Sequence, residues 1–350
     1  MTIHNQFFIE NLLKKKVFEA KRNFKGTEKQ FKREVSKKIN DSILSLNEAI
    51  RKGSLKGGFL TLKHTNKHKL NVKKKIETRY KSSLRLFDVF LELNSQIGRT
   101  FYTKYRKLFK DYDSQLKLDA LVEIHSRAIQ IAHEINLLVK NGYSDGAYAR
   151  WRSIHELSII FLFLYDTEQE VTQMYLDYEV IEAWDRLKKY REAKPKELGF
   201  QSVSRKEINS LSRKRDSLIV KYGNDFSKSY GWTMKVLPKE KRTIRGIEEF
   251  VRMDRLRGVY SSASENVHAG ISGNRNRLGL PNTKKLMFLA GPSEHGLIEP
   301  VQFTMYSITE IASAMLSAED SILNNLLNIF LLDFHEFVLK DFEKHSGKKP

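Results

Sequence analysis

The prolines of this 350-residue chain are confined to its second part, because all six lie at or after position 195. Proline removes a backbone donor and breaks helices, so the preceding residues are free to form long ones. Apolar residues recur there at helical spacing, most clearly over 114–141. Alternating strand patterns are almost absent, and one short strand is expected at 286–290. The sequence therefore predicts an all-α helical bundle with a short irregular or β insertion near 270–300.

Positive charge is concentrated at the N-terminal end. The chain carries a net charge of +20, and residues 1–80 contribute 21 Lys or Arg against 7 Asp or Glu. A basic helix is expected over 28–51, and the glycine-containing segment 52–69 is interpreted as a connector. The predicted organisation is a basic helical N-terminal arm, residues 1–69, followed by a helical bundle domain, residues 70–345.

This charge indicates an acidic partner. A basic segment attracts polyanions, with nucleic acid as the first candidate and an anionic membrane surface as the second. The alternative is a charged surface that does no more than contact solvent. The N-terminus lacks the basic-then-apolar order of a signal peptide, and the apolar stretch 322–339 is interrupted by polar residues, which favours a buried helix face. We therefore expect a cytoplasmic protein without a membrane span.

The densest group of chemically active side chains lies at 150–156. A helix turns about 100° per residue, which places Arg152 and Glu156 about 40° apart and His155 about 60° from Arg152. Together with Arg150, these residues form a candidate catalytic group that can bind phosphate and move a proton. The alternative is an ordinary ion pair between Arg152 and Glu156 beside a core histidine.

A second group lies at 257–268. Arg257, Ser261, Ser264 and His268 follow one another at i, i+4, i+7 and i+11, which is one continuous helical stripe. With Tyr260, the first three are candidates for substrate binding, and His268 is a candidate catalytic residue. The stripe can equally be a solvent face, with His268 placed at a helix C-terminus where a cation is favoured.

Metal and cofactor signals are weak. The chain has no Cys, which excludes disulfides, thiolate metal sites and a Cys nucleophile. It has no phosphate-binding glycine loop, dinucleotide fingerprint or nucleophile elbow, and these absences argue against ATPases, dehydrogenases and α/β-hydrolases. We predict neither a metal nor a cofactor. His125, which lies among isoleucines, is interpreted as a core histidine.

Three stretches together resemble a bacterial family of unknown function, domain-of-unknown-function family 5677. They are residues 141–156, 260–268 and 291–296. The resemblance extends over about 70–340 and leaves the N-terminal arm outside. It implies a fold and a site location, but no activity.

A looser likeness is to the HEPN superfamily of helical ribonucleases in toxins and phage defence. Its motif, an Arg followed after four to six residues by His on one helix, is similar to Arg150 and His155. The likeness implies metal-independent RNA cleavage by a homodimer. Arg150 and Arg152 would then hold phosphate, His155 with His268 would move protons, and Glu156 would orient Arg152.

The leading hypothesis is accordingly an RNA-acting protein, an endoribonuclease-like effector with RNA favoured over DNA as the partner. The alternative is a non-catalytic nucleic-acid-binding or protein-interaction module, in which the polar group is a buried structural network.

Overall fold

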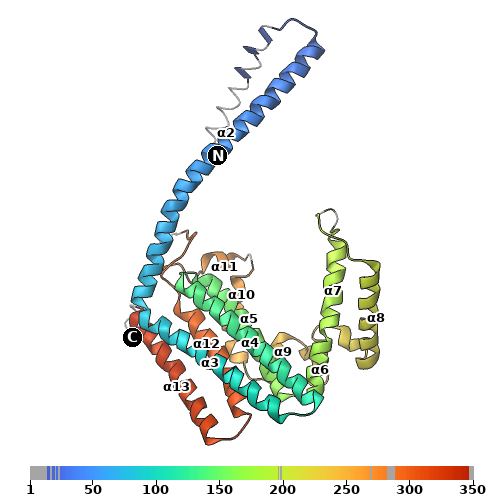
Figure 1. The fold of residues 1–350 in the computed structure, drawn as a ribbon, viewed down its shortest axis with the longest axis vertical. Coiled ribbons are helices and arrows are strands. Elements are labelled where there is room, and N and C mark those ends of the chain that lie inside the picture. The colour runs from blue at the N-terminus through green and yellow to red at the C-terminus, as the bar shows by residue number, and fades with distance from the viewer. Residues whose placement is uncertain are drawn as a thin grey trace. The chain divides into compact units, whose positions relative to one another are not determined.

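The computed structural model describes residues 14–346 except 16–17, 20, 23, 196, 198, 269 and 282–287, with the backbone alone for 38–39, 41–46 and 49–50. Its helices, labelled in Figure 1, are α2 (Glu28–Arg79), α3 (Lys81–Leu108), α4 (Tyr112–Lys140), α5 (Ser144–Asp166), α6 (Gln169–Asp177), α7 (Glu179–Glu192), α8 (Arg205–Tyr222), α9 (Ile244–Phe250), α10 (Arg257–Glu265), α11 (Ile271–Arg275), α12 (Ile298–Ser317) and α13 (Ile322–His345). The described residues contain no strand, and the all-α prediction is confirmed.

The predicted insertion near 270–300 is irregular but has no described β-structure. It contains the short helix α11. Of the strand expected at 286–290, residues 286–287 lie outside the described part of the chain, and 288–290 have no regular structure.

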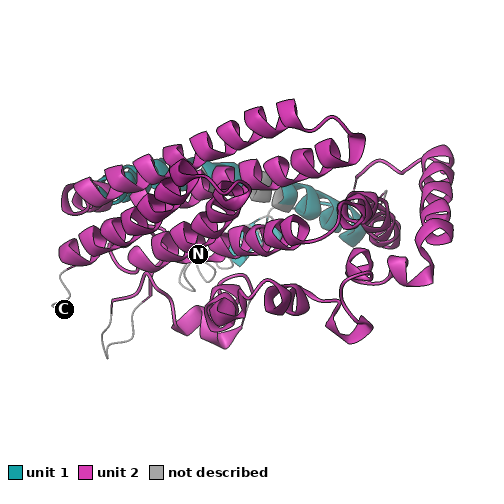
Figure 2. Cartoon of the chain, turned by 90° about the horizontal axis from the view of Figure 1, so that it is seen from below, with its two compact units in different colours: residues 1–70 teal, residues 71–350 magenta. Residues whose placement is uncertain are grey.

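The chain divides into two compact units, residues 1–70 and residues 71–350, which are coloured separately in Figure 2. The expected connector at 52–69 is wrong, because α2 continues as one helix from Glu28 to Arg79. Glycine weakens a helix by about 1 kcal/mol relative to alanine but does not remove a backbone donor as proline does. Three glycines among leucines and lysines are therefore compatible with a continuous helix.

Replacing Gly53, Gly57 and Gly58 with alanine is expected to increase helicity. A Cβ atom at each position would meet nothing within 4 Å. The triple variant should stabilise α2 by about 2–3 kcal/mol, because each exposed substitution contributes roughly 1 kcal/mol. Circular dichroism of the full chain during heating measures this change. A signal equal to that of the unchanged protein would contradict a helical 52–69 segment.

The core of the second unit is built by α3, α4, α5, α12 and α13, which lie side by side in Figure 1. The α4–α5 turn contains Gly142 with a φ of 79°, a conformation that favours glycine. A Cβ there would also meet the backbone oxygen of Ser293 at 2.7 Å. On α5, the fully buried Trp151 donates from Nε1 to Ser307 Oγ at 3.1 Å. These contacts fix the position of α5, which carries the 150–156 segment.

The interpretation of 322–339 as a buried helix face is wrong. On α13, Leu331, Val338 and Phe342 are buried, whereas Ile322 is 82% exposed and Leu326 is 59% exposed. By length and composition alone, α13 is the one helix among the described residues that is long and apolar enough to cross a membrane. The absence of a membrane span therefore stays a prediction.

The chain bends sharply just before the 257–268 segment. Arg252 has a φ of 59°, and it separates α9 from the 3-10 turn Asp254–Leu256 and from α10. Neither proline nor glycine marks this bend in the sequence. As a result, α9 and α10 are separate helices that both pack on α5.

Candidate functional site

A buried carboxylate links the three helices α5, α9 and α10. Glu248 and His155 are both 0% exposed, and His155 Nε2 lies 2.8 Å from Glu248 Oε1. Arg257 Nη1 donates to the other carboxylate oxygen, Oε2, at 2.9 Å. A buried charge is costly unless it is paired, so these two partners make the burial of Glu248 tolerable.

Sequence reasoning missed Glu248. One signal was present: Ile244, Ile247 and Val251 form an apolar stripe at helical spacing, and Glu248 falls four residues after Ile244 on the same face. A carboxylate on an apolar stripe indicates a buried and paired group.

A second set of contacts surrounds the hydroxyl of Tyr260 on α10. Tyr260 Oη donates to Glu156 Oε1 at 2.5 Å. Arg152 Nε donates to the same carboxylate oxygen at 3.0 Å and to Tyr260 Oη at 2.7 Å. Burial, followed by the hydrogen bond to Glu156, raises the pKa of Tyr260 to about 12. The phenol is therefore a hydrogen-bond donor to the carboxylate at neutral pH.

The two arginines lie against the ring of Tyr260. Their guanidinium carbons are 4.8 Å (Arg152) and 5.1 Å (Arg257) from its centroid. The His155 ring lies on the same tyrosine at a centroid distance of 5.5 Å. Tyr260 thus joins the buried His155–Glu248 pair to the more exposed Arg152–Glu156 pair, and we call these residues with Arg257 the polar cluster.

The polar cluster lies in a segment that is similar to a known protein family. Residues 118–285 match the model of a family of unknown function, DUF5677. This segment, just under half of the chain, is similar to that family, and we call it the DUF5677 segment. No curated protein and no solved structure matches the chain.

The DUF5677 segment contains two of the three stretches that carried the resemblance, 141–156 and 260–268. The third stretch, 291–296, lies outside it, and the match is shorter than the expected 70–340. All six residues of the polar cluster lie within the DUF5677 segment, whereas α2 does not.

Arg150 is not part of the polar cluster. Its Nε donates to Glu134 Oε2 on α4 at 2.5 Å, and its Nη1 donates to Ser153 Oγ at 3.1 Å. His155 contacts Glu248 on α9 instead. The two residues that resemble the HEPN motif therefore contact different neighbours, and the likeness to that superfamily stays a prediction.

The remaining residues of the 257–268 stripe make no described contact with the side chains of the cluster. Ser264 Oγ donates to the backbone oxygen of Tyr260 at 2.8 Å, an interaction within α10. Ser261 and His268 are exposed, and no contact of theirs with the cluster is described. The helix ends at Glu265, so the predicted stripe does not continue to His268.

The cluster has a closed part and an open part. His155 and Glu248 are inaccessible, so His155 cannot touch a substrate in this conformation. The side chains of Arg152, Glu156 and Arg257 are 29%, 37% and 38% exposed. In the searched part of the chain, no group of three or more His, Asp or Glu could hold a metal ion. The open part can bind an anion through arginine, while the closed part positions Arg257.

Proposed function

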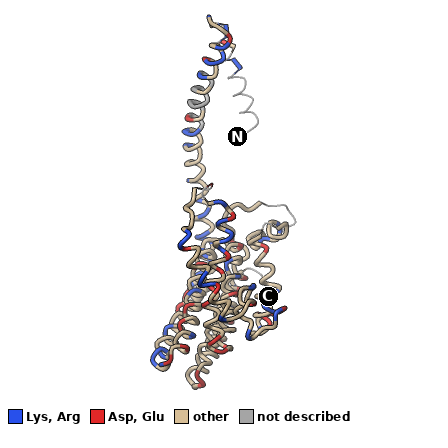
Figure 3. The backbone as a smooth tube through the Cα atoms, turned by 90° about the vertical axis from the view of Figure 1, so that its right-hand side faces the viewer, with Lys and Arg blue, Asp and Glu red and all other residues tan. Residues whose placement is uncertain are grey.

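We propose that this protein binds nucleic acid through the basic helix α2, which corresponds to the non-catalytic alternative rather than to the leading hypothesis. One observation carries the proposal: from Ala49 to Ile76 the sequence has nine Lys or Arg and no Asp or Glu. Every side chain from Arg51 to Asn71 is exposed. Figure 3 shows Lys and Arg recurring along this helix. Such a surface attracts phosphate groups. Two of its lysines pair with flanking glutamates, Lys52 with Glu48 and Lys73 with Glu77.

Four lysines of this helix share one side of it. Lys52, Lys56, Lys63 and Lys67 fall within an arc of about 60° and extend over about 22 Å of helix axis. A stripe of that length can contact several successive phosphates of a nucleic-acid backbone, a contact that is independent of base sequence. The preference for RNA comes from the HEPN likeness alone, so the experiment compares RNA with DNA.

The test is fluorescence anisotropy with RNA and DNA oligonucleotides of equal length at several salt concentrations. Replacing all four stripe lysines with glutamine should weaken binding by at least about tenfold and reduce the salt slope by about 3, because each phosphate contact contributes roughly 0.7–0.9. The matched control, which removes the same charge, replaces the exposed Lys107, Lys206, Lys214 and Lys228 with glutamine. Equal losses in the two variants would contradict the proposal.

RNA cleavage is a second candidate function, and one observation favours it. The partly exposed Arg152, Glu156 and Arg257 converge on one phenol, an arrangement that can hold a phosphate beside a carboxylate. Cleavage of RNA in EDTA by the purified protein is the assay. Arg152→Ala should abolish it if the cluster is catalytic, while Arg245→Ala, an exposed arginine on α9, should not. If the unchanged protein does not cleave RNA and Arg152→Ala lowers the melting temperature, the cluster is a structural network.

A further inference from the structure

A cavity of about 280 Å³ lies in the second unit between α3 and α4, away from the polar cluster. Its wall contains apolar, hydroxyl and ionisable groups from both helices. Among the lining residues are Ser95, Gly98, Arg99, His125, Ser126 and Ile129. Sites for small molecules typically have this composition, in which an apolar surface carries a few polar groups that fix the orientation of the ligand.

His125, one of the lining residues, carries an unpaired acceptor that is itself shielded from solvent. The side chain is 3% exposed, and its ring lies directly on α3, because a Cβ at Gly98 would be 2.4 Å from ring atoms. The ring makes a hydrogen bond with the backbone of Asn94, while Nε2 has no hydrogen-bond partner among the described residues. An unpaired buried polar atom costs about 1–3 kcal/mol, so such an atom beside a cavity indicates a missing partner.

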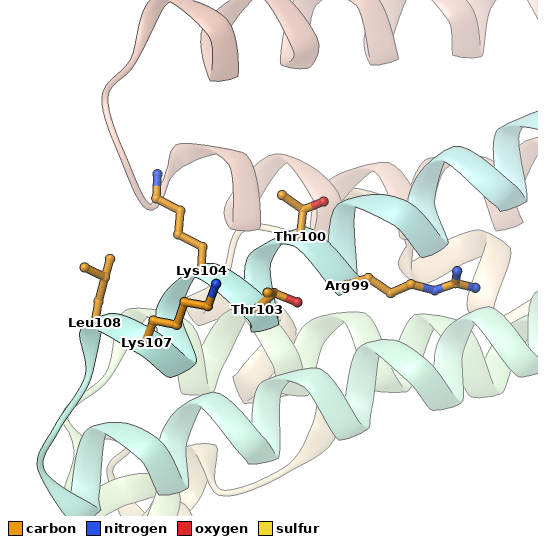
Figure 4. A pocket seen from close by; sticks show the side chains of 6 residues that line it. All are labelled: Arg99, Thr100, Thr103, Lys104, Lys107 and Leu108. Carbon is orange, nitrogen blue, oxygen red and sulfur yellow. The ribbon is translucent and has the colours of Figure 1, made fainter.

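Arg99 contributes a positive charge to the wall of this cavity. It is exposed, and among the described residues it has no ion-pair partner. In Figure 4 its side chain extends away from Lys104 and Lys107 on the same helix. Figure 4 shows a neighbouring pocket that Arg99 lines together with these lysines, so Arg99 borders both hollows. Its guanidinium is available to an anion.

We propose that this cavity binds a small phosphorylated sugar, the chemistry shared by a nucleoside monophosphate and a ribose phosphate. Arg99 binds the phosphate, the Ser95 and Ser126 hydroxyls complete the polar contacts, and His125 Nε2 accepts a hydrogen bond from a ligand hydroxyl. Because Nε2 is buried, binding opens the α3–α4 groove locally. The inference does not depend on α2, which contributes nothing to the cavity.

The ionisation of His125 supports an acceptor role. Burial lowers the pKa of His125 from 6.5 to about 4. The imidazole is therefore neutral at pH 7, and one ring nitrogen carries a free lone pair. A cationic imidazolium would instead present two donors and no acceptor.

The test is an NMR titration of the full chain with its histidine rings labelled with ¹⁵N. AMP, ribose 5-phosphate and inorganic phosphate are added in separate experiments. Both sugar phosphates should shift the His125 Nε2 resonance, which is assigned by its absence in His125→Gln. Calorimetry should show that inorganic phosphate binds about tenfold more weakly, the loss expected for one missing hydrogen bond. Tighter binding of AMP than of ribose 5-phosphate would identify the nucleotide as the source.

Arg99→Gln should weaken binding of both sugar phosphates by at least about tenfold, as expected for loss of a charge-assisted contact. The matched control Lys107→Gln, on the same helix but outside this cavity, should leave their affinity unchanged. No His125 shift with any probe at millimolar concentration would overturn the proposal, and so would equal affinities in the two variants. Oligonucleotide binding by Arg99→Gln should persist in every case, which separates this outcome from the fate of the proposed function.

Discussion

Replacing Glu248 with alanine is expected to lower the free energy of unfolding by about 3–5 kcal/mol, the usual cost of breaking a buried ion pair. The change leaves the buried His155 Nε2 without its partner at 2.8 Å and removes the acceptor of Arg257 Nη1 at 2.9 Å. It also opens a space among fully buried side chains. Urea denaturation, analysed for midpoint and slope, measures the loss.

Two further variants separate charge from shape. Glu248→Gln keeps the volume and one acceptor oxygen but loses the charge, so its cost should be smaller than that of alanine. Glu249→Gln is the matched control, because this neighbouring carboxylate is 34% exposed and pairs with Lys241 and Arg245 at the surface. Surface pairs contribute about 0–1 kcal/mol. If Glu248→Ala cost no more than Glu249→Gln, the buried network would not hold α9 and α10 on α5.

The second large effect concerns pH. His125 has a folded-state pKa of about 4 because burial disfavours its charged form, against an ordinary value of 6.5. Above pH 6.5 neither state binds the proton, and the stability is fully present. As the pH falls from 6.5 to 4, the unfolded chain takes up a proton that the folded chain does not, so stability is lost. The total is about 3 kcal/mol, since one pKa unit corresponds to about 1.4 kcal/mol.

This contribution is measured as a difference between variants. The free energy of unfolding is determined at pH 7 and at pH 4.5 for the unchanged protein and for His125→Gln. The variant should lose less stability over this interval, because carboxylates common to both proteins cancel in the comparison. Burial also lowers the pKa of His335, so this residue makes stability fall with pH in the same direction. His335 is present in both proteins, and its effect cancels in the comparison. His133→Gln, which replaces an exposed histidine on α4, is the control. If the free energy of unfolding depended on pH identically in the unchanged protein and in His125→Gln, the burial of a neutral His125 would be contradicted.

Helical periodicity predicted the α4 helix and the Asn141–Gly142 turn well, because both depend on neighbours within a few residues. The same reasoning failed at 52–69, where the glycines were weighed as breaks although their cost is small. It also failed on α13, because apolar composition alone does not show which face has a partner.

The sequence predicted only part of the candidate site. Arg152, His155 and Glu156 were selected together, and all three belong to the polar cluster. Arg150 was selected with them but contacts α4, since five residues on a helix place two side chains about 140° apart. Glu248 was missed because it lies 93 positions after His155 in the sequence, and no local pattern links them.

Composition and local periodicity were sufficient to establish the helical class, the concentration of positive charge in residues 1–80 and the absence of cysteine chemistry. Those properties depend on residue type and on near neighbours. The left-handed conformation of Arg252, the burial of the Glu248 carboxylate and the unpaired Nε2 of His125 depend instead on helices distant in sequence. Each arises because packing of α5 with α9 and α10, or of α3 with α4, outweighs local preference. Long-range contacts therefore assembled both the polar cluster and the His125 cavity.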